Sequence, residues 1–174
     1  KNLKSVLPLI RTVHWAPAPN PIDVAFHKFN NWNSRPVFIN QLDVEVLRDF
    51  GEKLTLSEDR KMAVYSSDDR SNIRNRKALN ISFFWLNKSL NPTENSDLDR
   101  RVDSIKQQYL YIDLGSQGLK ELTDSVLDEF NRLGEATRAG NRVTWNYPEF
   151  KRAVIFEFFP DREIGVELTI TRTR

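Results

Sequence analysis

Three acidic residues in the second half of the chain, Asp113, Glu157 and Glu167, could together support metal-dependent hydrolysis of a phosphodiester. Each lies on or beside a stretch with the residue pattern of a β-strand. A two-metal nuclease needs two or three carboxylates that converge within about 4 Å of its ions. Position 169 is Thr, so no lysine accompanies Glu167 to stabilise developing charge. The three acids are therefore candidate catalytic residues of an alternative function only, a divergent metal-dependent nuclease or phosphodiesterase.

Ordinary structural roles account for the same acids. Asp113 stands at the end of an apolar stretch and Gly115 follows closely, which is typical of a strand that leads into a helix. Glu157 is flanked by two phenylalanines, and across a sheet it would pair with a base such as Arg142 or Arg172. We favour these structural roles, so the leading interpretation is a protein without catalysis.

The sharpest local group of bases lies in the polar stretch 67–77. Four bases stand there against two acids: Arg70, Arg74, Arg76 and Lys77. Because guanidinium groups bind phosphate as bidentate forks, this loop is the binding site of a second alternative function, a nucleic-acid-binding domain. The simpler interpretation is a solvated loop whose acids neutralise its bases. The whole chain has 26 basic and 24 acidic residues, a smaller excess than we expect of a strongly basic nucleic-acid binder.

Two tryptophans in segments rich in Pro and Asn are candidate anchors for a protein partner. Trp15 is followed by three prolines, and Trp32 has asparagines on both sides. Exposed aromatic side chains often supply much of the binding energy at protein interfaces. We therefore predict a binding role for Trp15 and Trp32, with a Pro/Trp-containing N-terminal arm over residues 1–21.

The sequence indicates no metal site and no cofactor site. The chain has no cysteine and only two histidines, His14 and His27, with Asp23 between them. A zinc site needs about four ligands in a fixed geometry, and this set is too small and too loosely spaced. The glycine motifs of dinucleotide-binding folds and of P-loops are both missing from the sequence. We therefore predict neither a metal nor a cofactor.

The composition is that of a globular chain. Its 174 residues are 39% hydrophobic and 11% aromatic, which is enough for one domain with a substantial core. No apolar run approaches the roughly 20 residues that cross a bilayer, so we predict no membrane association. The lack of cysteine favours a reducing compartment, and we expect a cytoplasmic location.

The most regular patterns lie in the second half of the chain. Residues 142–174 have the pattern of three consecutive antiparallel strands, and apolar and polar residues alternate over 164–171. Residues 160–163 supply the turn chemistry between the last two strands. An apolar stripe at helical spacing begins near Gly115 and stops at Gly134. Weaker patterns predict strands at 36–39, 61–66, 79–86 and 107–113, and helices at 22–32 and 40–51.

These patterns predict a single α+β domain over residues 22–174. Its sheet should be mainly antiparallel and end in a three-stranded C-terminal meander, with the helices packed on one face. The leading function is a non-catalytic protein interaction or assembly module that docks through its arm and its sheet. Its partner would be another protein or a second copy, giving an oligomer, with nucleic acid as the alternative partner.

Overall fold

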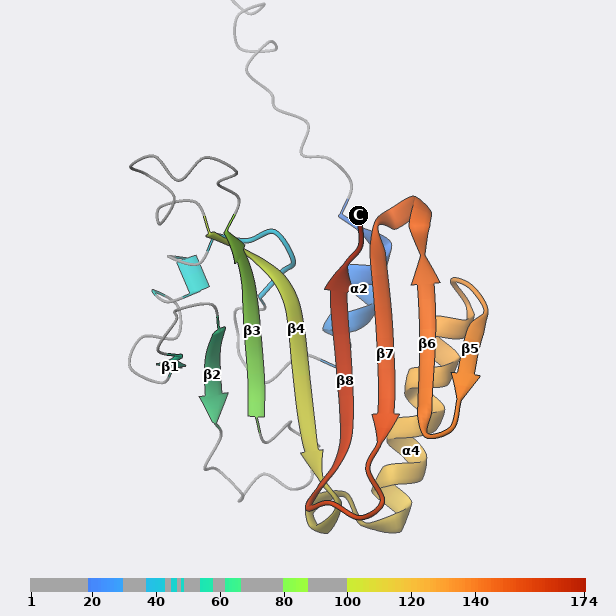
Figure 1. Ribbon diagram of the computed structural model, residues 1–174. Helices are drawn as coiled ribbons and strands as arrows, with labels where there is room; N and C mark the ends of the chain where they lie inside the picture. The colour runs from blue at the N-terminus through green and yellow to red at the C-terminus, as the bar shows by residue number, and fades with distance from the viewer. Residues whose placement is uncertain are drawn as a thin grey trace, which may run out of the picture.

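The computed structural model describes residues 19–29, 37–42, 45–46, 48, 54–57, 62–66, 80–87 and 100–174. Its centre is one eight-stranded antiparallel sheet in the order β1-β2-β3-β4-β8-β7-β6-β5 (Figure 1). The strands are β1 (Leu54–Leu56), β2 (Met62–Ser66), β3 (Asn80–Asn87), β4 (Arg100–Leu110), β5 (Ala136–Ala139), β6 (Arg142–Tyr147), β7 (Arg152–Phe158) and β8 (Ile164–Arg172).

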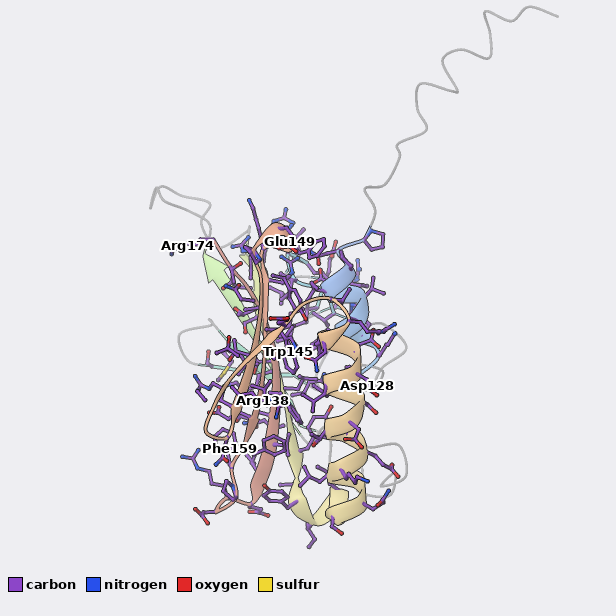
Figure 2. The ribbon with its side chains drawn as sticks, turned by 90° about the vertical axis from the view of Figure 1, so that its right-hand side faces the viewer. Asp128, Arg138, Trp145, Glu149, Phe159 and Arg174 are labelled. Atoms are coloured by element: carbon purple, nitrogen blue, oxygen red, sulfur yellow. The ribbon has the colours of Figure 1, made fainter. Side chains whose placement is uncertain are left out.

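Two α-helices lie on the same face of this sheet. They are α2 (Pro21–His27) and α4 (Tyr111–Asn131), and both stand behind the strands in Figure 1 and to one side of them in Figure 2. A short 3-10 helix, η4 (Pro148–Phe150), joins β6 to β7. The predicted fold class, α+β with a mainly antiparallel sheet and helices on one face, is confirmed. We call the face that carries α2 and α4 the inner face, and the opposite one the open face.

The predicted C-terminal meander is present as β6, β7 and β8, each antiparallel to the next. Val166, Leu168 and Ile170 are buried on the inner face, while Glu167 and Thr169 are half-buried on the open face. The alternation arises because successive side chains of a strand point to opposite faces. The residues on β8 therefore lie on the faces that the sequence pattern indicates.

Strand β4 departs from the prediction, since it runs from Arg100 to Leu110 rather than over 107–113. Its pairing with β3 contains a register shift, so the buried residues Val102 and Ile105 stand three apart and the period of two is interrupted. Strand β5 was not predicted, because Ala136–Ala139 is short and mostly exposed.

The end of β4 comes early because the chain turns into α4 at Tyr111. The Tyr111 ring packs over Gly165 of β8 so closely that a Cβ at that position would collide with it. Inside α4, Gly115 has φ of 64° and interrupts the helix, so the long regular part begins beyond it. From there the predicted apolar stripe is buried or packed against the core, with Leu122, Val126 and Phe130 innermost.

Helix α2 is shorter than the predicted 22–32. Ile22, Ala25 and Phe26 are buried, whereas Val24 is 44% exposed. The helix begins where the Asn20 side chain accepts a hydrogen bond from the Ile22 backbone N–H. The Asn20 amide also donates to the Phe150 carbonyl, which ties the start of α2 to η4.

The predictions between α2 and β4 had mixed outcomes. The strands predicted at 61–66 and 79–86 are β2 and β3. The strand predicted at 36–39 is absent, because Val37 and Phe38 are irregular and Ile39 and Asn40 form a turn. Asn40, the first residue of the helix predicted at 40–51, has φ of 74° and donates its N–H to the Val102 carbonyl. Of the helix predicted over 40–51, the described residues at 45, 46 and 48 are helical.

The core fills the space between the inner face and the two helices. Its largest fully buried aromatic residues are Phe26, Phe130, Trp145, Tyr147 and Phe156. Trp145 lies between the sheet and α4 in Figure 2. The Tyr147 hydroxyl donates to the Phe130 carbonyl at 2.7 Å, so this buried polar group is satisfied at the end of α4. In the described part of the chain, no helix combines the length and the apolar character needed to cross a membrane.

Candidate functional site

Two of the three predicted acids meet on the open face of the sheet. Glu157 of β7 and Glu167 of β8 stand directly opposite each other across the two strands. Asp113 belongs to α4, and its side chain lies outside the described residues. The structure therefore brings two of the candidate acids together.

Each of these two glutamates already has a partner on its other side. The Arg142 guanidinium donates to both carboxylate oxygens of Glu157, at 3.1 and 3.3 Å, so the predicted cross-strand pairing is confirmed. The Gln108 amide donates to Glu167 at 2.7 Å, and the Lys106 ammonium lies 3.7 Å from the same carboxylate. Like charges directly opposite each other repel, and the contacts with Arg142, Gln108 and Lys106 offset the repulsion between the two carboxylates.

The open face of these strands is close to neutral. Two bases and two acids alternate with uncharged residues along it: Lys106, Arg142, Glu157 and Glu167. A surface that attracts phosphate needs an excess of bases, and these four described side chains provide none. Among the residues that the structure describes, no three His, Cys, Asp or Glu side chains are grouped so that they could hold a metal ion.

The remaining predicted site residues cannot be compared with the structure. Six residues lie outside its described part: Trp15, Trp32, Arg70, Arg74, Arg76 and Lys77. Their roles in binding protein or nucleic acid stay predictions.

A buried ion pair on the inner face was missed by the sequence reasoning. The Arg152 guanidinium donates to both carboxylate oxygens of Asp23, at 2.8 and 3.1 Å, and joins β7 to α2. Arg172 of β8 is the cross-strand neighbour of Arg152, and it donates to Asp103 of β4 at 3.0 Å. The alternation of residues along β7 could have indicated this ion pair. Arg152 lies on the same face as the buried Val154, and a buried base needs an acidic partner.

His27 lies at the other end of α2, with its ring 4.1 Å from the Phe38 ring between centroids. Burial lowers the pKa of His27 below its ordinary value of 6.5, and the nearby carboxylate of Asp23 opposes that shift. Its Nδ1 atom is buried and has no hydrogen-bond partner among the residues that the structure describes. The Asp23 carboxylate is already engaged in the bidentate ion pair with Arg152.

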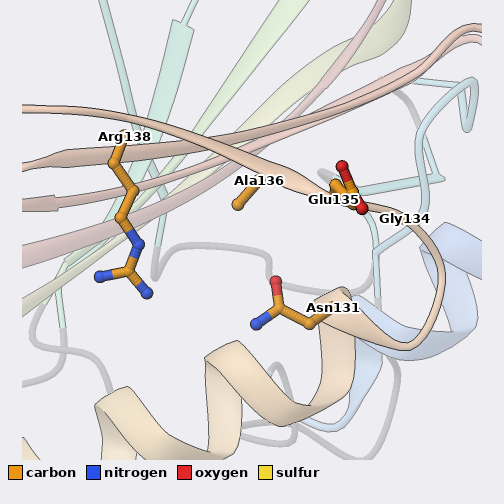
Figure 3. A pocket seen from close by; sticks show the side chains of 5 residues that line it. All are labelled: Asn131, Gly134, Glu135, Ala136 and Arg138. Carbon is orange, nitrogen blue, oxygen red and sulfur yellow. The ribbon is translucent and has the colours of Figure 1, made fainter.

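A hollow lies in the surface between β5 and the end of α4. It has a volume of about 320 Å³, and Figure 3 shows the residues that line it: Asn131, Gly134, Glu135, Ala136 and Arg138. We call it the β5 hollow. The Arg138 and Asn131 side chains point toward one another across it, one from the strand and one from the helix (Figure 3).

The orientation of the Asn131 amide is set by Trp145. The indole N–H of Trp145 donates to Asn131 at 2.8 Å, and since an indole nitrogen only donates, the atom that it meets is the amide oxygen. The NH2 group of Asn131 is consequently turned toward Arg138 (Figure 3). In the described part of the chain neither this NH2 group nor the Arg138 guanidinium has an acceptor, so two donors converge on the hollow.

Strand β5 also ends the sheet, with β6 as its sole neighbour in the described strand order. The hairpin loop between them has two residues, and Gly140 at its first position has φ of 58°, as in a type II′ turn. The Asn141 carbonyl accepts a hydrogen bond from the Phe158 N–H, so the backbone groups of Asn141 are directed toward β7. Because this direction alternates along a strand, the backbone groups of Arg142 and Thr144 are directed toward β5.

The same alternation decides which backbone groups of β5 are free. Ala139 and Thr137 oppose Arg142 and Thr144 as hydrogen-bonded pairs, which leaves the N–H and C=O groups of Ala136 and Arg138 directed away from the sheet. We call these outward groups the β5 edge. Ala136 and Arg138 therefore supply both the β5 edge and, through their inner-face side chains, one wall of the β5 hollow.

A comparison of the chain with protein-family models, with characterised proteins and with solved structures found no match.

Proposed function

We propose that the protein is a non-catalytic interaction module that binds an extended segment of another protein along the β5 edge. The observation that carries this proposal is the double role of Ala136 and Arg138, whose backbone faces outward while their side chains line the β5 hollow. A strand added at such an edge gains hydrogen bonds from the backbone and selectivity from a pocket for its side chains.

The simpler interpretation is that β5 is a protected edge. Natural proteins keep edge strands short and charged to prevent unwanted pairing, and β5 has four residues and one arginine. An edge that only needs protection does not need a hollow beneath it. The combination of free backbone groups, a hollow and two convergent donors favours recognition over protection.

A single substitution tests the proposal. Ala136→Pro removes the outward N–H of residue 136, while the bonds to β6, made by residues 137 and 139, remain. Ala136→Ser is the matched control, since it changes the side chain and keeps the N–H. Both variants and the wild-type protein are used to select from a phage library of random nine-residue peptides, with circular dichroism to verify their folding.

The proposal predicts that the wild type and Ala136→Ser enrich a shared set of peptides and that Ala136→Pro does not. Peptides that bind all three proteins equally would contradict edge binding. A wild-type selection without enrichment would contradict an interaction module at this edge.

Assembly through the N-terminal arm is a separate part of the proposal, and it rests on the sequence of Trp15 and its three prolines. Deletion of residues 1–16 should leave a folded monomer and abolish self-association in sedimentation experiments. Unchanged association of the deletion variant would contradict a role for the arm.

A cytoplasmic location also belongs to the proposal, on the basis of the cysteine-free composition.

A further inference from the structure

We propose that the segment bound at the β5 edge carries one acidic side chain, which the β5 hollow binds between Arg138 and Asn131. This inference rests on the proposed function and adds the chemistry of the partner. It concerns an acidic side chain within an extended protein segment.

The donors of the hollow select an acceptor. Arg138 offers a fork of N–H groups that matches the two oxygens of a carboxylate. Asn131 offers its NH2 group, because its oxygen is already bonded to the Trp145 indole. Both side chains point into the hollow from opposite sides (Figure 3), so a carboxylate between them would receive hydrogen bonds from two elements.

The position of the acid follows from the pairing geometry. Residues directly opposite each other in neighbouring antiparallel strands share a face of the sheet. Arg138 has its side chain on the inner face, together with that of Ala136. A partner residue opposite Arg138 would therefore direct its side chain into the hollow, whereas its immediate neighbours would point to the open face.

The surrounding charges limit the partner to a single acid. Glu135 lines the same hollow and would repel a second carboxylate. The stretch 111–140 carries six acids against three bases, so a strongly acidic segment would be disfavoured along α4. The expected partner is an otherwise neutral β-forming segment with one Asp or Glu.

Neither β5 of a second copy nor residues 1–18 of the chain would provide the acid. Strand β5 has no acid between Ala136 and Ala139, so a second copy paired edge to edge would place no carboxylate in the hollow. Residues 1–18 also contain neither Asp nor Glu. The occupant that we propose is a segment of a different protein, since neither of these two stretches could supply the acid.

The test uses a peptide that was selected by its dependence on residue 136, synthesised with its acid and with Gln in that place. Binding of both peptides is measured by fluorescence anisotropy to the full chain and to three variants. Arg138→Gln removes the guanidinium. Asn131→Asp keeps the acceptor for Trp145 and replaces the NH2 group with a carboxylate oxygen. Arg174→Gln, an exposed base at the C-terminus, controls for net charge.

The acidic peptide should bind at least about tenfold more weakly to Arg138→Gln and to Asn131→Asp than to the wild type, and equally well to Arg174→Gln. The Gln peptide should bind all four proteins within about twofold of one another. Moving the acid by two positions should also weaken binding.

Two results would overturn the inference. Edge-dependent peptides without a shared acid would leave the proposed interaction module in place and refute the acidic partner. Equal effects of Arg138→Gln on the acidic and the Gln peptide would refute the contact between carboxylate and guanidinium. A selection that yields no edge-dependent peptide contradicts the proposed function itself, and the inference falls with it.

Discussion

Arg152 of β7 and Asp23 of α2 form a bidentate ion pair in which each side chain is only 10% exposed. Removal of one partner of such a pair leaves a buried charge without compensation. We therefore expect Asp23→Ala to lower the free energy of unfolding by about 3–5 kcal/mol. Urea denaturation followed by Trp fluorescence measures this change.

The ion pair between Arg142 and Glu157 provides the control for that prediction. Arg142 is 53% exposed, so solvent screens the attraction, and Glu157→Ala also removes the repulsion with Glu167. Its effect should stay below about 1 kcal/mol. If the two alanine variants were equally stable, α2 would not be held to β7 by this ion pair.

The pH dependence of stability should reveal His27. Burial lowers the pKa of His27 in the folded protein below the 6.5 of the unfolded chain, so the unfolded chain binds the proton more tightly. Stability is therefore unaffected above the unfolded pKa and falls as the pH decreases below about 6.5. Urea denaturation at pH 7 and at pH 5 should show a smaller loss for His27→Gln than for the wild type. A loss of the same size in both proteins would contradict the role of His27.

Leu168 should be a major contributor to the stability of the meander. It is fully buried on the inner face, and Leu168→Ala is expected to cost about 2–5 kcal/mol because it leaves a cavity. Thr169→Ala, on the open face of the same strand, should cost less than about 1 kcal/mol. Thermal and urea denaturation of both variants measure the contrast, and a loss below about 1 kcal/mol for Leu168→Ala would contradict its place in the core.

Substitution of two adjacent glutamines of β4 should change the free energy of unfolding in opposite directions. Gln107 is fully buried on the inner face, and neither polar atom of its amide forms a hydrogen bond in the described structure. Gln107→Met should raise the free energy of unfolding by about 1–3 kcal/mol, because it removes an unsatisfied buried amide. Gln108→Met should lower it by about 1 kcal/mol, because it removes the hydrogen bond to Glu167. Destabilisation by both changes would show that the Gln107 amide is satisfied.

The strands and the helix whose apolar residues recur at regular spacing were predictable from the sequence. The alternation around Leu168 and the helical stripe that contains Val126 and Phe130 identified the core of the second half. The extent of β4 was not predictable for two reasons. A register shift in its pairing with β3 interrupts the period of two between Val102 and Ile105. The Tyr111 ring also packs over Gly165 of the neighbouring strand β8, where the glycine leaves room for it. Local patterns do not contain such long-range contacts.

The candidate site was harder to predict than the fold. The sequence suggested Glu157 and its pairing with Arg142, since both lie on strongly patterned strands. It did not indicate the β5 hollow, because Arg138 lies in a short, mostly exposed strand and Asn131 is an ordinary residue near the end of a helix. Their meeting depends on how the hairpin folds back beside α4, and spacing along the chain does not encode that geometry.

Amide hydrogen exchange of β5 with a selected peptide at saturation tests the central claim most directly. In the free protein the N–H groups of Ala136 and Arg138 face outward, while those of Thr137 and Ala139 are bonded to β6. Binding along the β5 edge should slow exchange at residues 136 and 138 by at least about tenfold and leave residues 137 and 139 unchanged. Unchanged exchange at 136 and 138 while the peptide is bound would contradict the account.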